Sequence, residues 1–493
     1  MTRSAAIQSR RMLLGAACVS LLTACNFAPK YKQPAIETTP HFKELTPEQA
    51  QKITAWQPAA PAENTQRGQW WEFFGDQKLN ELESKIEVNN QTIAAAVARL
   101  EAARAIVQQT RASLFPLVAL NPSVTRSRAR LRTQSNTTAL STPNHPFTDY
   151  NLPLNASWEL DLWGRIRNQV KATAFEAKAT EADLENIRLS ARTELAIDYF
   201  QLRGLDAQKD LFESAVKAYQ DSFDLAKARY ETGIASDQDV AQAETQLTTT
   251  RAQATDLGIQ RAQLEHAIAV LLGESPSGFS VEAAPFHGHP AIVPFGVPST
   301  LLQRRPDVAA AERRVMEDNV NIGVARAAYF PTLTLSGSTG FQSSSLGDLA
   351  TWPSFVWSIG GALSETIFDA GRRHGVTREA WANYNESVAN YRQTVLASFK
   401  EVEDSLSALR ILASEIHDEN AAVDASRRYL TLASDRYKFG IDSFLNVITA
   451  QTTLLGNQRT AVNLQFEQLT ASIQLIKAIG GSWEQSMTES DHQ

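Results

Sequence analysis

The sequence predicts a mainly helical fold with membrane β-strands, in which the second half of the chain repeats the first. Two observations support this prediction. The same residue types recur at a fixed distance along the chain, as Gly440 follows Gly233 by 207 residues. Four short segments alternate apolar and polar residues, whereas beyond the amino terminus no apolar run approaches the roughly 18 residues of a spanning helix. If this chain crosses a membrane, it must therefore do so as strands.

The repeat is clearest at two predicted helix–turn–helix segments, which both read Arg-Tyr-x-x-Gly-Ile-x-Ser. Gly233 and Gly440 fit the left-handed position just beyond a helix end, where a Cβ atom would clash. Ser236 and Ser443 then fit the N-cap of the following helix. The residues three positions further along, Asp239 and Asn446, would complete an approximate capping box in each copy.

The amino terminus is typical of an exported lipoprotein. Residues 1–24 combine three arginines with an apolar run, as an export signal does. They lead into Leu22-Thr23-Ala24-Cys25, the pattern of a bacterial lipobox, in which the cysteine is acylated and becomes the first residue. Asn26 follows, which favours the outer membrane over retention in the inner membrane. Residues 25–68 are rich in proline and predict a lipidated, extended tether.

Charge and cysteine content limit the partners. The formal net charge is −7, and removal of the signal takes away three arginines and no acid, which gives −7 − 3 = −10. This balance argues against nucleic acid as a partner. Cys18 lies within the signal, so the mature chain has one cysteine and cannot form an internal disulfide. We expect a covalent lipid on Cys25, contact with outer-membrane lipid, and no cofactor.

Each half is expected to contain a helix, two strands separated by a loop, a long helix, a turn and a last helix. The first helix should cover residues 79–113, and its counterpart in the second half residues 306–328. The long helices should cover residues 166–231 and 376–439, with Gly204 as a candidate break in the first. At 1.5 Å per residue, sixty-odd residues give roughly 100 Å of helix, which no globular domain needs. The returning helices should run from residue 237 to 272 and from the second turn to residue 479.

Strands are expected around residues 118–124, 150–162, 333–341 and 355–367, each with one apolar and one polar face. Phe355, Trp357 and Ile359 would face lipid. A lumen would be lined by small polar residues, namely Thr332, Thr334, Ser336 and Ser338.

Four strands are too few to enclose a water-filled lumen, which needs roughly twelve. Three chains supply that number. The predicted fold class is therefore a trimeric channel-tunnel, with a shared 12-stranded β-barrel continued by a long α-helical barrel. The main alternative, a soluble sandwich attached to a coiled coil, leaves the lipobox and the missing strands unexplained.

Enzymatic and metal-binding functions find no support in the sequence. It contains no Ser/His/Asp order, phosphate loop or cluster of metal ligands. His287 and His289 could touch a metal, but no acidic or cysteine partner is apparent, so a surface loop is the better interpretation. We therefore expect no catalytic residues and no metal site.

Several motifs, in this order, resemble the TolC-like outer-membrane factor family, in particular the lipoprotein branch that serves efflux pumps (the NodT or OprM type). The resemblance covers essentially the whole mature chain. It rests on the lipobox, Trp70-Trp71, Phe74-Gly75-Asp76, the segments 158–165 and 302–308, Phe330-Pro331 and the two repeated turns.

The resemblance implies a homotrimeric, passive exit duct of a tripartite efflux system in the Gram-negative outer membrane. The helical barrel would project into the periplasm and meet a periplasmic adaptor (a membrane fusion protein). An inner-membrane pump, of the resistance-nodulation-division type, would supply the energy. The duct would conduct drugs or other small toxic compounds. A duct for type I secretion or metal-ion efflux is the alternative, although secretion members usually lack a lipobox.

The resemblance also assigns roles to the two turns, which would form the periplasmic tip at residues 232–239 and 439–446. Asp239 and Tyr437 would form a closing pair between neighbouring helices. Leu445 could instead act as an apolar constriction, and Asn446 stands where other members carry an acidic ring. Asp442 departs from the family pattern, since some members have arginine there. The adaptor would dock on the turns, at Gly233, Ile234, Ser236, Gly440, Ile441 and Ser443.

The predicted organisation follows from these assignments. A signal peptide (1–24) and a lipidated tether (25–68) precede the first repeat (69–305). The second repeat (306–481) and a carboxy-terminal tail (482–493) follow.

Overall fold

The structure is a computed structural model of the chain, and it describes residues 26–36, 42–44, 69–128, 146–284 and 305–481. The chain divides into two compact units. Unit 1 comprises residues 1–34, 101–179 and 312–390, and unit 2 comprises residues 35–100, 180–311 and 391–493. Each unit draws residues from both halves of the sequence, so the two repeats do not fold as separate bodies.

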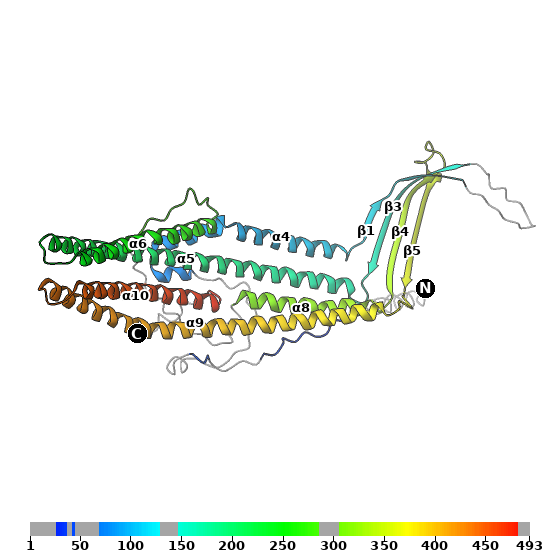
Figure 1. Ribbon diagram of the computed structural model, residues 1–493. Coiled ribbons are helices and arrows are strands. Elements are labelled where there is room, and N and C mark those ends of the chain that lie inside the picture. Colours follow the sequence, from blue (N-terminus) through cyan, green and yellow to red (C-terminus); the bar gives the residue numbers. More distant parts are fainter. Residues whose placement is uncertain (1–25, 37–41, 45–68, 129–145, 285–304, 482–493) are drawn as a thin grey trace, which may run out of the picture. The chain divides into compact units, whose positions relative to one another are not determined.

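Unit 1 contains one antiparallel sheet in the order β1-β3-β4-β5, with β2 also paired to β3 (Figure 1). β3 comes from the first repeat and β4 from the second, so the repeats join at the centre of the sheet. The strands are β1 (Leu117–Leu120), β2 (Ser123–Ser127), β3 (Phe147–Leu160), β4 (Thr332–Ser343) and β5 (Phe355–Ser364).

The first predicted strand is divided into β1 and β2. Leu120 lies opposite Leu154 and Ser123 lies opposite Asn151, so β2 continues the register of β1 along β3. The interruption falls at Pro122, which has no N–H to donate to a ladder. In register terms the sheet therefore has the four strands that the sequence predicted.

The register confirms the two faces of the sheet. Residues that pair across neighbouring strands share a face, and Ile359 lies opposite Gly337, which lies opposite Ala156. Ser336, one position along, lies opposite Ser157 and Gly360 on the other face. The apolar face carries Val118, Leu120, Val124, Leu152, Leu154, Trp158, Leu160, Leu333, Leu335, Phe341, Phe355, Trp357, Ile359 and Leu363.

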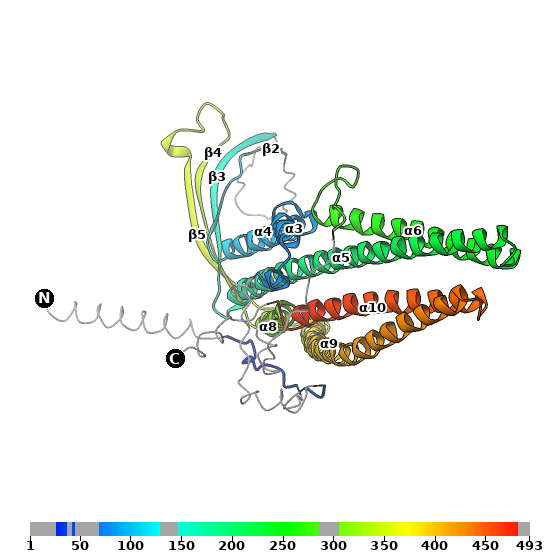
Figure 2. The ribbon, with the colours of Figure 1, turned by 90° about the vertical axis from the view of Figure 1, so that its left-hand side faces the viewer.

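Two antiparallel helical hairpins contribute most of unit 2 (Figure 2). The first hairpin consists of α5 (Arg165–Glu231) and α6 (Asp237–Leu271), and the second of α9 (Arg372–Lys438) and α10 (Phe444–Ala478). Both α5 and α9 have 67 residues, and both α6 and α10 have 35. These equal lengths are the structural counterpart of the 207-residue repeat. No helix in the described ranges is long and apolar enough to cross a membrane.

The shorter helices correct one expectation and confirm another. The predicted helix 79–113 is divided into α3 (Gln77–Asn89) and α4 (Gln91–Ala112), while α8 (Pro306–Ala327) agrees with its prediction. Asn90 makes the break, because its side chain accepts from Ile93 N at 2.9 Å and donates to Leu271 O at 2.7 Å. Such side-chain bonds to the backbone compete with the helix.

Gly204 does not interrupt α5. A Cβ atom at this position would lie 2.9 Å from Cδ2 of Phe466 in α10. The glycine therefore allows α5 and α10 to approach closely, and α5 continues through it without a break.

Three aromatic side chains anchor the start of the first repeat in the core. Trp70, Trp71 and Phe74 are buried, while Phe73 is half exposed. They belong to the 3₁₀ helix η1 (Trp70–Phe74), and the Phe74 ring lies 5.0 Å from that of Phe200 in α5.

Candidate functional site

The first turn has the predicted geometry. Gly233 has a φ of +74°, and the Ile234 amide donates back to Arg229 O at 2.8 Å, which closes the end of α5. Ser236 Oγ accepts from Asp239 N at 3.3 Å, and Asp239 Oδ2 accepts from Ser236 N at 3.4 Å. The predicted capping box is therefore present at the start of α6.

The second turn repeats the glycine but not the capping box. Gly440 has a φ of +71°. Ser443 is the N-cap of α10, but its side chain makes no capping bond, so the predicted box with Asn446 is wrong. Asp442 makes the side-chain contacts at this turn instead, since its Oδ1 accepts from Ser443 N at 2.9 Å and from Asn446 Nδ2 at 2.5 Å. Its Oδ2 accepts from Arg436 Nε at 3.2 Å.

These contacts account for the acidity of Asp442. The Ser443 amide and then the Arg436 guanidinium hold the pKa of the Asp442 carboxyl below its usual range, because both stabilise the charged form. Asp442 is therefore ionised throughout the physiological pH range.

A small apolar core joins the two hairpins at their turns. It combines Tyr437 and Phe444, whose ring centroids are 5.0 Å apart, with Ala226, Ala243 and Val447. All four helices of the two hairpins contribute to this core, which we call the tip core. The hairpins of one chain are thus held together by apolar contact at the turns.

Arg229 completes this contact from the first hairpin. Its Nη1 donates to Tyr437 O at 2.9 Å, and its guanidinium lies over the Tyr437 ring, 4.6 Å from the centroid. A cation over an aromatic face adds an electrostatic attraction to the apolar packing. Sequence reasoning did not assign this role to Arg229, although its recurrence as Arg436 in the repeat was visible.

Asp239 and Tyr437 are not hydrogen-bonded within the chain. Tyr437 is buried, and in the described part of the chain its hydroxyl has no hydrogen-bond partner. Burial raises the pKa of Tyr437, and the negative charge of Asp239 raises it further. Asp239 is thus near enough to act on the ring electrostatically, but its carboxylate serves the capping box. The predicted link between them stays a prediction for the assembled channel.

The remaining predicted residues of the turns lie on the surface. Leu445 is 55% exposed, which is unusual for a leucine inside a helix that also contributes to the tip core. Ile234, Ile441 and Phe439 are also exposed. Together they make an apolar surface at the turns that the single chain leaves open.

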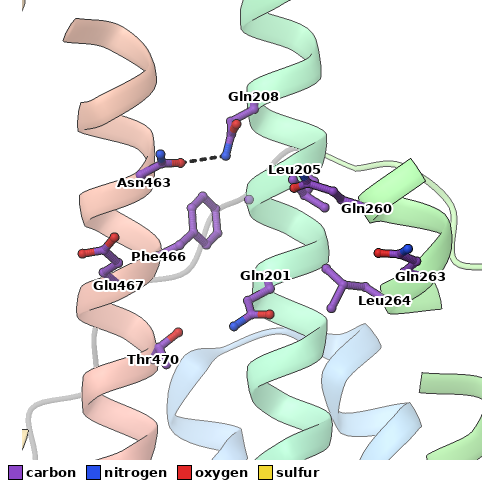
Figure 3. Close-up of a pocket in the computed structure, with 11 residues that line it drawn as sticks. Gln201, Leu205, Gln208, Gln260, Gln263, Leu264, Asn463, Phe466, Glu467 and Thr470 are labelled. Carbon is purple, nitrogen blue, oxygen red and sulfur yellow. Dashed lines mark hydrogen bonds between the residues drawn. The ribbon is translucent and has the colours of Figure 1, made fainter. Parts of the chain in front are cut away.

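A cleft of about 470 Å³ lies between α5, α6 and α10 (Figure 3). Gln208 Nε2 donates to Asn463 Oδ1 across it at 2.7 Å, and the Phe466 ring points from α10 toward α5. Amide side chains surround an apolar floor that includes Leu205 and Leu264. The lining also includes the carboxylate of Glu467, and the cleft shows no arrangement of catalytic groups.

Within the described ranges, no group of three or more His, Cys, Asp or Glu residues could hold a metal ion. His287, His289 and the acylation candidate Cys25 lie outside those ranges.

Comparisons with known proteins agree with one another. Residues 82–274 and 297–481 match the family model described as outer membrane efflux protein. The chain is 32% identical over 473 residues to the solvent efflux pump outer membrane protein SrpC of Pseudomonas putida, which covers 94% of this chain and 97% of that one. It is 30% identical over 472 residues to the cation efflux system protein CusC of Escherichia coli, which covers 95% and 98%.

Among solved structures, the outer-membrane channel OprN is similar, with a TM-score of 0.83 and 28% identity. The similarity covers 93% of this chain and 100% of that one. The predicted fold class is confirmed by this likeness.

The two N-cap serines provide a matched pair of substitutions. Ser236→Ala should speed amide hydrogen exchange at the start of α6 about fivefold, because loss of an N-cap costs about 1 kcal/mol. Ser443→Ala should leave exchange at the start of α10 unchanged, because the Ser443 side chain makes no capping bond there. Hydrogen exchange followed by mass spectrometry of peptides from both helix starts would measure this. Equal effects of the two substitutions would show that Ser443 does cap α10.

Proposed function

Since the chain belongs to the outer membrane efflux protein family, we propose that three copies of it close one continuous sheet around the pore of an efflux duct. The chain is an exit duct of the outer membrane and not an enzyme, and it has the fold of the trimeric channel-tunnels. Efflux by such a duct needs no covalent chemistry, so its function depends on how the pore is walled, anchored and gated.

The observation that carries this proposal is the sheet with one apolar face and two open edges. β1 and β2 pair only with β3, and β5 pairs only with β4, in the described part of the chain. Pairing β5 of one copy with β1 and β2 of the next would satisfy both edges. It would also direct all apolar faces to lipid and all polar faces to the lumen.

The anchor is the second part of the proposal. We infer that Cys25 is acylated, and the lipobox supports this. The residues just after it are fixed on unit 1, because Phe27 stacks on Phe330 with centroids 4.3 Å apart and Asn26 Oδ1 accepts from Asn168 Nδ2 at 2.9 Å. Mass spectrometry of the mature amino-terminal peptide should show acyl chains on Cys25, and a free thiol there would contradict the anchor.

The partners are the third part. We propose that the exposed apolar residues of the turns dock a periplasmic adaptor, which connects the duct to an inner-membrane pump of the resistance-nodulation-division type. Ile234, Ile441 and Phe439 are the apolar residues available for this contact. As cargo we propose small toxic organic compounds, as the likeness to a solvent efflux protein supports. Metal-ion efflux is the alternative, which the likeness to CusC supports.

The gate is the fourth part. We propose that Asp239 leaves the capping box and accepts from Tyr437 when the channel closes, with Leu445 narrowing the pore beside them. The buried, unpartnered hydroxyl of Tyr437 supports this, since such a group gains by finding an acceptor. The long 3.4 Å bond from Ser236 N to Asp239 indicates that little is lost when the box opens.

The first functional prediction concerns the two faces of the sheet. Ile359→Arg should impair assembly in the membrane, because a charge facing hydrocarbon costs roughly 2–4 kcal/mol near the midplane. Ser336→Arg should leave assembly intact and change single-channel conductance in planar bilayers, because it adds three bulky charges to the lumen. If Ser336→Arg blocks assembly while Ile359→Arg only alters conductance, the assignment of the faces is reversed.

The second functional prediction concerns the gate. Asp239→Ala combined with Tyr437→Phe should raise the resting conductance and admit large antibiotics, because a single hydrogen bond contributes only about 1 kcal/mol and closure needs several such links. Ser236→Ala is the control, since it removes the capping box but keeps the carboxylate. If the double variant conducts like the parent while Leu445→Ala alone opens the channel, the gate is apolar.

A further inference from the structure

We propose that the two kinds of contact between hairpins in the assembled channel differ, and that Arg436 holds the contact between neighbouring chains. It would do so by reaching Tyr230 and Asp237 of the next chain. We call the contact between the two hairpins of one chain the inner seam, and the contact between hairpins of neighbouring chains the outer seam. The inference rests on the trimer proposed above.

The inner seam is visible in the chain. Arg229 of the first hairpin lies over the ring of Tyr437 in the second, and Phe444 also packs against Tyr437. Tyr437 is only 6% exposed. The inner seam is therefore a desolvated, apolar contact with one cation over an aromatic ring.

The repeat transfers this geometry to the outer seam. In a ring of three chains, first and second hairpins alternate. The second hairpin of one chain then meets the first hairpin of the next chain. This contact should resemble the one between the two hairpins of a single chain. The residue that repeats Arg229 is Arg436, and the residue that repeats Tyr437 is Tyr230. Arg436 of one chain should therefore approach Tyr230 of its neighbour.

The exposure of both residues agrees with a contact that one chain cannot complete. The side chain of Arg436 is 56% exposed and Tyr230 is 47% exposed. In the inner seam, their counterpart Arg229 is half buried and Tyr437 is buried. A large aromatic residue this exposed at a helix end is what an interface with a second copy would cover.

The two seams differ because two residues break the repeat. Phe444 of the inner seam corresponds to Asp237 in the outer seam, so an exposed carboxylate replaces an aromatic ring. Asp442 corresponds to Ala235, and it already binds Arg436 within the chain at 3.2 Å. Arg436 thus lies between an acid of its own chain and an acid of the neighbour.

This competition makes the outer seam the weaker one. Exposed ion pairs contribute little and are screened by salt, whereas apolar burial is not. The outer seams should therefore separate first when the channel opens, and Arg436 then returns fully to Asp442.

A thiol crosslink tests the geometry. Chains carrying Tyr230→Cys and Arg436→Cys should be joined by a short, cleavable bismaleimide into covalent dimers and trimers, with loss of most of the monomer band in denaturing gels. Arg229→Cys with Tyr437→Cys is the matched control, since its crosslink stays within one chain and leaves the monomer band. Each single variant controls for Cys25. Monomers alone from the Tyr230/Arg436 pair, in a sample that an amine crosslinker shows to be trimeric, would overturn the inference.

A charge exchange tests the proposed ion pair. Arg436→Glu should raise the resting conductance in planar bilayers, and the added substitution Asp237→Arg should lower it again. Failure of Asp237→Arg to restore closure would overturn the role of Asp237. If the parent protein is not trimeric at all, the proposed duct assembly fails as well, which separates that outcome from failure of the seam alone.

Discussion

An antiparallel sheet with open edges and one apolar face is the constraint on which the rest of this protein depends. Hydrocarbon offers no hydrogen-bond partners, so every backbone N–H and C=O at membrane depth must be paired within the protein. The strands β1, β2 and β5 leave one edge each without a partner in the described part of the chain. The sheet becomes stable in lipid only when further copies cover these edges, and the pore is a consequence of that closure.

The internal repeat provides a second requirement of the channel, because it supplies two matching helical hairpins for its wall. Long helices gain most of their stability from packing rather than from intrinsic propensity. Because α5 and α9 have the same length, as do α6 and α10, the ends of both hairpins contribute to one tip core. Each glycine adopts a positive φ that ends its long helix and lets the chain return.

Small departures from the repeat then create different contacts on a common backbone. The first turn closes with a serine and an aspartate in a capping box, while the second turn closes with Asp442, which also holds Arg436. The same helical geometry therefore holds Arg229 over an aromatic ring, whereas its counterpart Arg436 pairs with a carboxylate. A channel that must close tightly and still open benefits from such a difference, since only the weakly held contacts need to break.

The sequence by itself determined the elements, their order and the faces of the strands. These properties depend on local periodicity, on proline and glycine, and on side chains within four residues of one another. Gly233 and Ser236 are examples, since both behave as their neighbours predict. Only the tertiary structure decided which side chains find partners that are distant in the sequence. Asn90 breaks a helix because Leu271, 181 residues away, accepts its amide. Arg229 lies over the ring of Tyr437 only because two hairpins that are distant in the sequence pack together.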